Sequence, residues 1–217
     1  MLKRWALVIG HCTLSIVLAG CAARRVALPT DPGAPLPDFN QIHAQVSIAC
    51  SGVRTLTTEL GLSGRAGAER LRGRVVAGFA RPDSMRLEGV APFGAPAFIL
   101  AARGDTATLV LPRDNHALRG ARAEEILGAL TGVSLAPADL QAILTGCVVA
   151  TPRATAGRVH NNGWASIDLD GGATVYLQRQ GNAWQVRAAK RSGWQIEYPL
   201  WQGVFPQTVR LQIGRAH

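Results

Sequence analysis

The central stretch of the chain, residues 84–146, restricts the fold more than any other part of the sequence. It begins with two segments of alternating apolar residues, separated by residues 91–94 (Ala-Pro-Phe-Gly). A Pro/Gly pair between alternating runs is typical of a turn between antiparallel strands. Two short apolar-faced helices should follow, one closed by Gly132 and one running from Pro137 to Gly146. The stretch predicts strands, a projecting turn and a pair of helices.

The chain on both sides of this stretch also alternates between apolar and polar residues with a period of two. This pattern begins at Thr55 and, after the helices and a polar link near residues 151–162, resumes and continues to Ile213. It is typical of half-buried strands. Residues 170–172 (Asp-Gly-Gly) add a strong turn signal. We expect about ten or eleven antiparallel strands, and a single sheet of that width has to curl.

One more helix is expected before the strands. Asp38 can cap it, Gly52 can end it, and Phe39, Ile42 and Val46 lie on one face at helical spacing. The predicted fold class is α+β, with a strongly curled antiparallel sheet, an unclosed β-barrel, covered by three short helices. The alternative is a sandwich-like α+β fold with its helices at one end.

Residues 1–20 have the features of a targeting segment rather than of a folded element. Lys3 and Arg4 precede an apolar run that is too short and too interrupted for a spanning helix. Residues 18–21 (Leu-Ala-Gly-Cys) resemble a bacterial lipobox, in which the thiol of Cys21 receives the lipid. The alternative is an ordinary secretory signal with a chance cysteine. Ala22 after Cys21 favours the outer membrane in families that sort lipoproteins by this position.

Residues 21–37 are expected to be a lipidated tether, and residues 38–217 the folded domain. Prolines make this segment extended and prevent a helix; they are Pro29, Pro32, Pro35 and Pro37. If the segment serves only as a tether, its deletion should leave a folded, monomeric domain.

The net charge of the chain excludes few classes of function and does not indicate a nucleic-acid-binding protein. Without Lys3 and Arg4 the 23 basic residues fall to 21 against 14 acidic ones, which leaves a net charge of +7. Arg70, Arg72 and Arg74 alternate with apolar residues, which predicts a solvated face of a strand. No nucleic-acid-binding module is recognised, and the export signal places the chain outside the cytoplasm. A basic surface facing an acidic membrane or partner is still compatible with this pattern.

Two of the four cysteines should be available in the mature chain. Cys12 leaves with the targeting segment and Cys21 carries the lipid, so Cys50 and Cys147 form an even pair. In an oxidising compartment such a pair predicts a disulfide, with two buried free thiols as the alternative. No Cys/His spacing typical of zinc is present, so no metal is expected.

The sequence shows no catalytic pattern, and we expect neither an enzyme nor a cofactor. It has no nucleophile-elbow, zinc-protease or phosphate-loop motif. Glu124 and Glu125 are adjacent, so their side chains point about 100° apart on a helix and cannot form a close acid/base pair. Aromatic residues could line a cavity or could simply form the core; they are Trp164, Trp184, Trp194, Trp201, Phe79, Phe98 and Phe205.

The central stretch resembles outer-membrane lipoprotein receptors of the LolB family. The similarity lies in Arg86-Leu87, in residues 92–94 (Pro-Phe-Gly), in residues 123–126 (Ala-Glu-Glu-Ile) and in residues 130–132 (Leu-Thr-Gly). The resemblance implies an unclosed barrel with a helical lid and a monomeric, lipid-anchored protein on the periplasmic face of the outer membrane. It also implies that the protein accepts lipoprotein acyl chains from a soluble LolA-like carrier and helps to insert them.

The resemblance assigns roles to particular residues. Phe93 matches the exposed apolar residue of the turn implied in membrane insertion. The apolar cavity and its lid would be lined by Phe79, Met85, Leu87, Phe98, Leu100, Leu109, Leu127, Leu130, Ile143, Leu144 and Trp184. A second hypothesis is an envelope lipoprotein of the same fold that acts as a scaffold or assembly subunit, with a filled core and no lipid transfer.

Overall fold

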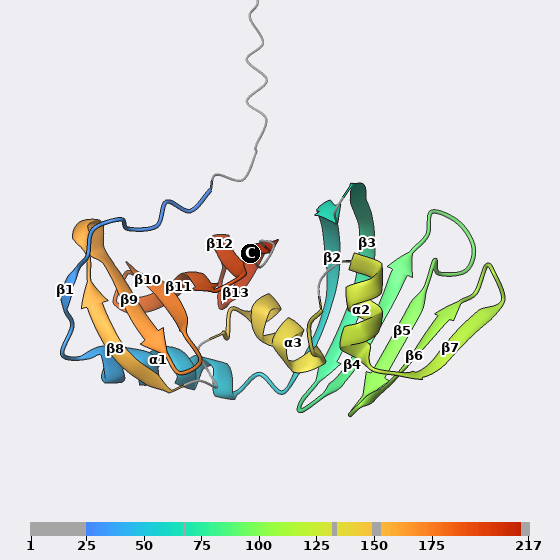
Figure 1. Ribbon diagram of the computed structural model, residues 1–217, viewed down its shortest axis with the longest axis horizontal. Helices are drawn as coiled ribbons and strands as arrows, with labels where there is room; N and C mark the ends of the chain where they lie inside the picture. Colours follow the sequence, from blue (N-terminus) through green and yellow to red (C-terminus); the bar gives the residue numbers. More distant parts are fainter. Residues whose placement is uncertain (1–24, 67, 132–133, 149–152, 214–217) are drawn as a thin grey trace, which may run out of the picture.

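The computed structural model describes residues 25–66, 68–131, 134–148 and 153–213. These residues form two antiparallel sheets and three α-helices (Figure 1). The structure therefore confirms an α+β protein built on antiparallel sheets. Cys21 and the rest of residues 1–24 lie outside the described residues, as does Gly132.

The six-stranded sheet follows the order of the chain, so that each strand pairs with the next one. Its apolar positions face α2 (Ala123–Thr131), which supplies Ile126 and Leu127 to the core of this half. Arg70, Arg72 and Arg74 are exposed, as the alternation predicts. The strands are β2 (Thr55–Ala66), β3 (Glu69–Ala80), β4 (Ser84–Val90), β5 (Ile99–Arg103), β6 (Thr106–Leu111) and β7 (His116–Ala121).

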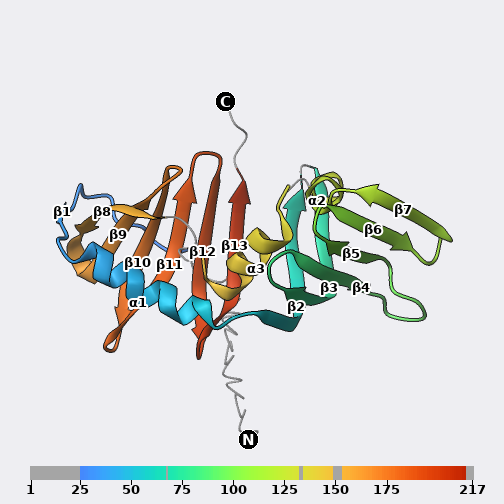
Figure 2. The ribbon, with the colours of Figure 1, turned by 90° about the horizontal axis from the view of Figure 1, so that it is seen from below.

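The seven-stranded sheet has the order β1-β8-β9-β10-β11-β12-β13. One of its faces is covered by α1 (Phe39–Ser51), which buries Ile42, Val46 and Cys50 at helical spacing (Figure 2). Tyr198 and Ile196 are at the centre of this second core. The strands are β1 (Ala34–Pro35), β8 (Ala154–Val159), β9 (Trp164–Leu169), β10 (Ala173–Gln180), β11 (Ala183–Arg191), β12 (Trp194–Gln202) and β13 (Phe205–Ile213), and a short 3₁₀ turn, Asn161–Gly163, precedes β9.

The third helix, α3 (Pro137–Thr145), lies between the two sheets and joins their cores (Figure 2). Ile143 belongs to the core of the seven-stranded half, whereas Leu140 and Leu144 pack against the core of the six-stranded half. The helix ends at Gly146, which has the left-handed conformation (φ 73°) that glycine adopts most easily. Both ends of α3 agree with the prediction.

A disulfide joins Cys50 to Cys147, as the sequence predicts. It links the last turn of α1 to the residue that follows Gly146. The whole six-stranded half lies in the sequence between these two cysteines. The disulfide therefore closes the base of a large insertion into the seven-stranded half.

Residues 25–36, which we call the N-terminal strap, lie along the seven-stranded sheet. The strap crosses the face opposite α1 and then turns around the β8 edge to reach α1 (Figure 1). Within it, β1 pairs with β8, and the backbone N–H of Leu36 donates to the carbonyl of Gly157 over 3.0 Å. This part of the expected tether is thus hydrogen-bonded to the folded domain.

The strands form two sheets of seven and six strands, not the single sheet of about ten or eleven that the alternation predicts. Strands β1, β7 and β8 are additional to that prediction, and β8 lies in the segment expected to be a polar link. The edges β2 and β13 are not hydrogen-bonded to each other. A cavity of about 630 Å³, the inter-sheet slot, lies between these edges and is also lined by Leu144 of α3.

Two further observations concern the ends and lengths of the helices. Asp38 precedes α1 at the cap position, but its side chain makes no capping hydrogen bond. Its backbone carbonyl accepts from the N–H of Ile42 over 3.1 Å. Among the described residues, no helix has both the length and the apolar character needed to span a membrane.

Candidate functional site

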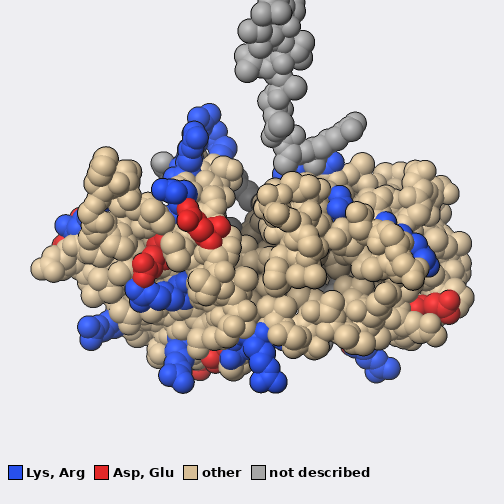
Figure 3. Space-filling model, turned by 180° about the vertical axis from the view of Figure 1, so that it is seen from behind, with Lys and Arg blue, Asp and Glu red and all other residues tan. Residues whose placement is uncertain are grey.

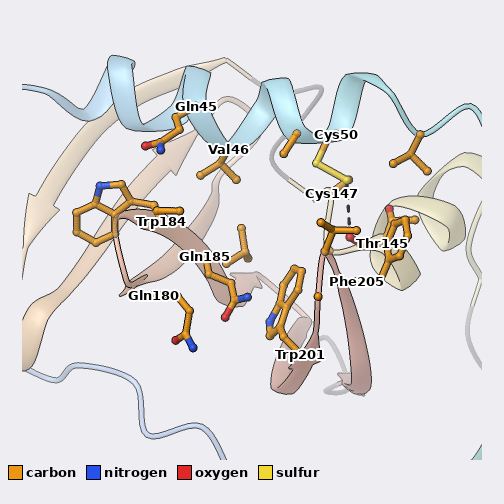
Figure 4. Close-up of a pocket in the computed structure, with 17 residues that line it drawn as sticks. Gln45, Val46, Cys50, Thr145, Cys147, Gln180, Trp184, Gln185, Trp201 and Phe205 are labelled. Carbon is orange, nitrogen blue, oxygen red and sulfur yellow. Dashed lines mark hydrogen bonds between the residues drawn. A yellow bond between two sulfur atoms is a disulfide. The ribbon is translucent and has the colours of Figure 1, made fainter.

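The strongest candidate site is a cavity of about 590 Å³ beside α1, which we call the α1 cavity (Figure 4). Its walls come from α1, from residues 145–147 at the end of α3, and from β10 to β13 near the turns that connect them. A volume of roughly 300–1,000 Å³ is typical of sites for small ligands. The disulfide forms part of the wall, because both Cys50 and Cys147 line the cavity.

The walls of the α1 cavity are mainly apolar. Val46 reaches it from α1, and Trp184 and Trp201 reach it from β11 and β12. Phe205 at the start of β13 lines the cavity as well. No residue among those that line the cavity carries a charge. Such a surface suits an uncharged, apolar ligand, because a buried charge without a partner is strongly unfavourable.

A few polar groups interrupt this apolar surface. Gln45 lies on α1, whereas Gln180, Gln185 and Trp201 lie on the opposite side of the cavity (Figure 4). The Nε1 atom of Trp201 is buried and has no hydrogen-bond partner among the described residues. An indole N–H only donates, and an amide both donates and accepts. The amides of the three glutamines can therefore bind the carbonyl oxygen of an ester or an amide.

The position of Trp201 depends on the glycine that ends α3. A Cβ atom at Gly146 would lie 2.4 Å from Cη2 of Trp201, so only glycine allows the ring to pack there. The Trp201 ring also contacts the ring of Tyr198, with 5.7 Å between the centroids. The Tyr198 hydroxyl also lacks a hydrogen-bond partner among the described residues, and burial raises its pKa well above the usual range. This phenol therefore stays neutral.

Two arginines lie on β10 and β11, two strands that contribute to the walls of the α1 cavity. The guanidinium carbon of Arg179 is 4.9 Å from the centroid of the Trp184 ring, a cation–π contact. Burial lowers the pKa of Arg187, whose Nη2 donates to the carbonyl of Pro199 over 3.2 Å. Neither arginine is among the residues that line the cavity. On the face drawn in Figure 3, the Lys and Arg side chains are scattered rather than gathered in one patch.

The residues predicted to line a cavity occupy several places. In the α1 cavity Trp184 is joined by Trp201 and Phe205, and Leu144 lines the inter-sheet slot. Ile143 is in the core of the seven-stranded half. The side chain of Leu130 lies outside the described residues. The remaining predicted residues belong to, or pack against, the core of the six-stranded half: Phe79, Met85, Leu87, Phe98, Leu100, Leu109 and Leu127.

Phe93 projects from the loop between β4 and β5. Its side chain is 89 % exposed, the largest exposure among the large apolar residues described. The loop is tied at its base by two backbone hydrogen bonds, one in each direction, between Gly89 and residues 97–98. Arg113 also donates from Nη2 to the Phe93 carbonyl over 3.2 Å. The loop therefore presents an apolar ring to solvent on a backbone that is held in place.

A second polar cluster lies under the N-terminal strap. The carboxylate of Glu197, which is 2 % exposed as a residue, accepts from Arg210 Nη1 (2.9 Å), from Gln195 Nε2 (2.9 Å) and from the backbone N–H of Val26 (3.3 Å). Three groups satisfy this buried charge, as burial requires. The strap supplies one of them.

The strap makes a further contact through a histidine. Nε2 of His160 lies 2.8 Å from Oγ of Ser166, and Nδ1 lies 3.4 Å from Oδ2 of Asp31 in the strap. The order Ser, His, Asp resembles that of hydrolytic triads. However, Ser166 is only 3 % exposed and sits within a central strand, so a substrate cannot reach it in this conformation. The cluster binds the strap to the sheet.

The sequence gives no signal for the three glutamines of the α1 cavity or for the strap contacts of His160 and Glu197, because these groups meet only in the folded chain. Among the described residues no cluster of His, Cys, Asp and Glu is suited to hold a metal ion.

Comparisons of the chain with family models and with curated protein sequences each find no match.

Proposed function

We propose that this protein is a lipid-anchored receptor of the outer membrane that binds the acyl chains of lipoproteins in the α1 cavity. The proposal combines the cavity with the lipobox-like residues 18–21 and with the LolB-like features of the central stretch. The observation that carries it is an apolar cavity of about 590 Å³ lined by no charged residue. An acyl chain attached through an ester or amide matches both its walls and its few hydrogen-bond donors.

The function requires no covalent chemistry. Burial of an acyl chain contributes about 0.8 kcal/mol for each CH₂ group removed from water. A soluble LolA-like carrier would hold the same chains, so transfer needs only a slightly better fit in the receptor. The amides of Gln45, Gln180 and Gln185 support such a difference, because they line the cavity and can donate to the carbonyl oxygen of a bound ester or amide.

We assign to Phe93 the release of the lipoprotein acyl chains into the membrane. An exposed phenylalanine on a tied loop can enter the interfacial region of a bilayer without unfolding the domain. The anchor at Cys21 would keep the domain close to that bilayer. We further propose that the two sheets act together as the half-barrel of such receptors, with α3 as the joint between them.

The first experiment identifies the ligand. The protein is secreted without Cys21, purified without detergent and extracted, and the extract is analysed by mass spectrometry. Phospholipid or lipoprotein acyl chains in equimolar amount would support the proposal. Binding of a fluorescent palmitoyl lipopeptide is then measured. A protein that carries no lipid and does not bind this probe would contradict the proposal.

A pair of variants on α1 locates the binding site. Ala49 and Ala44 are both exposed on this helix, but only Ala49 lines the cavity. Ala49→Trp should fill the cavity and weaken binding about tenfold or more, which corresponds to about 1.4 kcal/mol. Ala44→Trp should leave binding unchanged. Equal effects of the two substitutions would place the ligand elsewhere.

The alternative function is a scaffold or assembly subunit of the envelope that transfers no lipid. The packing of Leu87, Leu100 and Leu127 in the core of the six-stranded half favours it, because these predicted lid and cavity residues are buried against one another. This alternative predicts that the purified protein carries no lipid. It also predicts that loss of the protein from cells alters an envelope complex without altering the location of lipoproteins.

A further inference from the structure

The two edge strands β2 and β13 face each other across the inter-sheet slot. β2 pairs only with β3, and β13 pairs only with β12, so each strand has one free edge within the part of the chain that the structure describes. The slot of about 630 Å³ is lined by residues 56–63 of β2, by residues 205–209 of β13 and by Leu144. Figures 1 and 2 both show β2 and β13 in the middle of the molecule, with α3 between them.

The backbone of these two edges defines the chemistry of the slot. A free strand edge presents N–H and C=O groups that need hydrogen-bond partners. An acyl chain cannot provide them, whereas an extended polypeptide can pair with an edge as an additional strand. Neighbouring strands lie about 4.8 Å apart, so one inserted strand would connect two edges separated by about twice that distance.

The side chains around the slot favour an uncharged segment. Its lining is formed by leucines, Val209, glycine, proline, small hydroxyl residues, Gln207 and Phe205, with one charged residue, Glu59. The carboxylate of Glu59 is already paired with Arg74 Nη1 at 3.1 Å, and both side chains are more than half exposed. The slot therefore offers no charge that would select an ionic ligand.

The slot adjoins the α1 cavity. Phe205 lines both, so a ligand could extend from one into the other past this side chain. A lipoprotein has this composition, since its acyl chains are attached to the first residue of an extended polypeptide. We infer that the slot binds the N-terminal polypeptide segment of an acylated protein as a strand between β2 and β13, while the acyl chains occupy the α1 cavity.

The identity of the cargo in this inference rests on the proposed function, but the pairing of strands does not. The test uses the full mature domain without Cys21 and four probes. These are a dipalmitoylated lipopeptide with eight uncharged residues, the same peptide without acyl groups, the same lipopeptide with alternate backbone nitrogens methylated, and palmitate. Hydrogen exchange of the amides in residues 55–63 and 205–213 is followed together with affinity.

The lipopeptide should slow amide exchange in both edge strands. The methylated lipopeptide should lose this protection and bind about tenfold more weakly, because it keeps the acyl chains but lacks the donors. The unacylated peptide at high concentration should protect the same amides, and palmitate should not. Equal binding of the two lipopeptides, with no protection of either strand, would overturn the inference.

A matched pair of variants separates this inference from the proposed function. Thr58→Trp should fill the slot, whereas Thr106→Trp changes an exposed threonine at the start of β6. Thr58→Trp should abolish protection by the unacylated peptide but leave palmitate binding intact, and Ala49→Trp should do the reverse. If Ala49→Trp does not weaken palmitate binding, the proposed function is wrong, whereas the inference about the slot is unaffected.

The same edges could instead pair with a second copy of the chain. Light scattering of the ligand-free protein distinguishes this case, since pairing between copies would give a dimer with both edges already protected from exchange. A monomer with fast exchange at β2 and β13 is the result that the inference requires. A protected dimer would overturn it.

Discussion

Phe93 and Phe98 lie in one loop but have opposite environments. Phe98 packs against the core of the six-stranded half, whereas Phe93 is 89 % exposed. The surrounding backbone accounts for the difference, because hydrogen bonds between Gly89 and residues 97–98 hold Phe98 against the sheet. The ring of Phe93 is therefore free to contact a membrane or a partner without disturbing the core.

The first prediction concerns the role of Phe93. Phe93→Ala should change the free energy of unfolding by less than about 0.5 kcal/mol, since the ring makes little buried contact. Phe79→Ala, in the core, should cost about 3–5 kcal/mol and serves as the control. Phe93→Glu should retain ligand binding and lose delivery of lipoprotein to liposomes. Urea unfolding and transfer are measured for each variant, and normal transfer by Phe93→Glu would refute the insertion role.

The second prediction concerns the glycine that supports Trp201. Gly146→Ala places a Cβ 2.4 Å from the Trp201 ring and forces alanine into a left-handed conformation. The backbone alone costs about 1–2 kcal/mol, so the urea midpoint should fall, and displacement of the indole should change its fluorescence. Gly52→Ala is the control, because Gly52 has a φ of −75° and no atom within 4 Å of the added methyl. Similar small effects of both substitutions would show that Trp201 does not rest on Gly146.

Individual residues were predictable where a local rule governs them. Gly146 follows from the need for a left-handed residue after a helix, and the Cys50–Cys147 bond follows from the pair of cysteines that is left if Cys12 belongs to a targeting segment and Cys21 carries a lipid. Contacts between distant segments were not predictable. Trp201 and Gln185 line a cavity with residues of α1, and nothing in their immediate sequence marks either of them as part of a site.

At the scale of elements, the N-terminal strap is part of the folded domain rather than a free tether. The strap is extended, as its prolines require, but it is hydrogen-bonded to the sheet at Val26, Leu36 and β1. Gly33 has a φ of 70°, and a Cβ at this position would lie 2.8 Å from the ring of His160. The strap therefore fits closely over one histidine before it enters β1.

The third prediction concerns this strap. Deletion of residues 22–36 removes the donor to Glu197 and the contacts of His160, so the domain should stay folded but lose at least about 2 kcal/mol of stability. Asp31→Ala should reproduce a part of this loss, and Thr30→Ala, at an exposed neighbour, should not. Limited proteolysis and urea unfolding measure both effects. An unchanged midpoint after deletion would show that the segment is only a tether.

The elements themselves followed from sequence more closely than their assembly did. The three helices and the turns at residues 91–94 and 170–172 agree with prediction, because caps, prolines and glycines act locally. Strand β8 escaped prediction because Ala154–Val159 lacks a clear alternation and gains its partners from β9 and the strap. The separation of β2 from β13 was not predictable either. The alternation of apolar and polar residues indicates which face of a strand is buried, but not which strands are neighbours.

At the scale of the whole molecule, the six-stranded half is an insertion whose two ends are joined by the disulfide. The bond closes a loop with a sequence separation of 97 residues. In the chain-entropy account, closing a loop of that length lowers the entropy of the unfolded chain. This stabilises the folded protein by about 4–5 kcal/mol. The bond also holds the base of α1 beside the end of α3, where the wall of the α1 cavity is formed.

The fourth prediction follows from this closure. The double variant Cys50→Ala, Cys147→Ala should unfold at lower urea concentration, with a loss of about 4–5 kcal/mol, and should bind palmitate less tightly. Wild-type protein in reductant should show a similar loss, whereas reductant should have no effect on the variant. Labelling of the denatured, unreduced mature protein should find no free thiol. Two reactive thiols would refute the bridge.

The last prediction concerns the cooperation of the two halves. Besides the disulfide, α3 connects them, since Ile143 packs in one core and Leu140 and Leu144 pack against the other. The four tryptophans among the described residues lie in the seven-stranded sheet, at Trp164, Trp184, Trp194 and Trp201, and a protein prepared without residues 1–20 contains no other. Tryptophan fluorescence therefore reports on one half alone, whereas far-ultraviolet circular dichroism reports on both.

In the wild type the two signals should change together as urea rises, because a shared helix makes unfolding cooperative. Leu140→Ala with Leu144→Ala removes about 1–2 kcal/mol of apolar contact at each site on the six-stranded side alone. The dichroism transition should then begin at lower urea concentration than the fluorescence transition. Leu118→Ala, at an exposed position on β7, should keep the two transitions coincident. Coincident curves in the double variant would mean that α3 is not the joint and that the disulfide alone couples the halves.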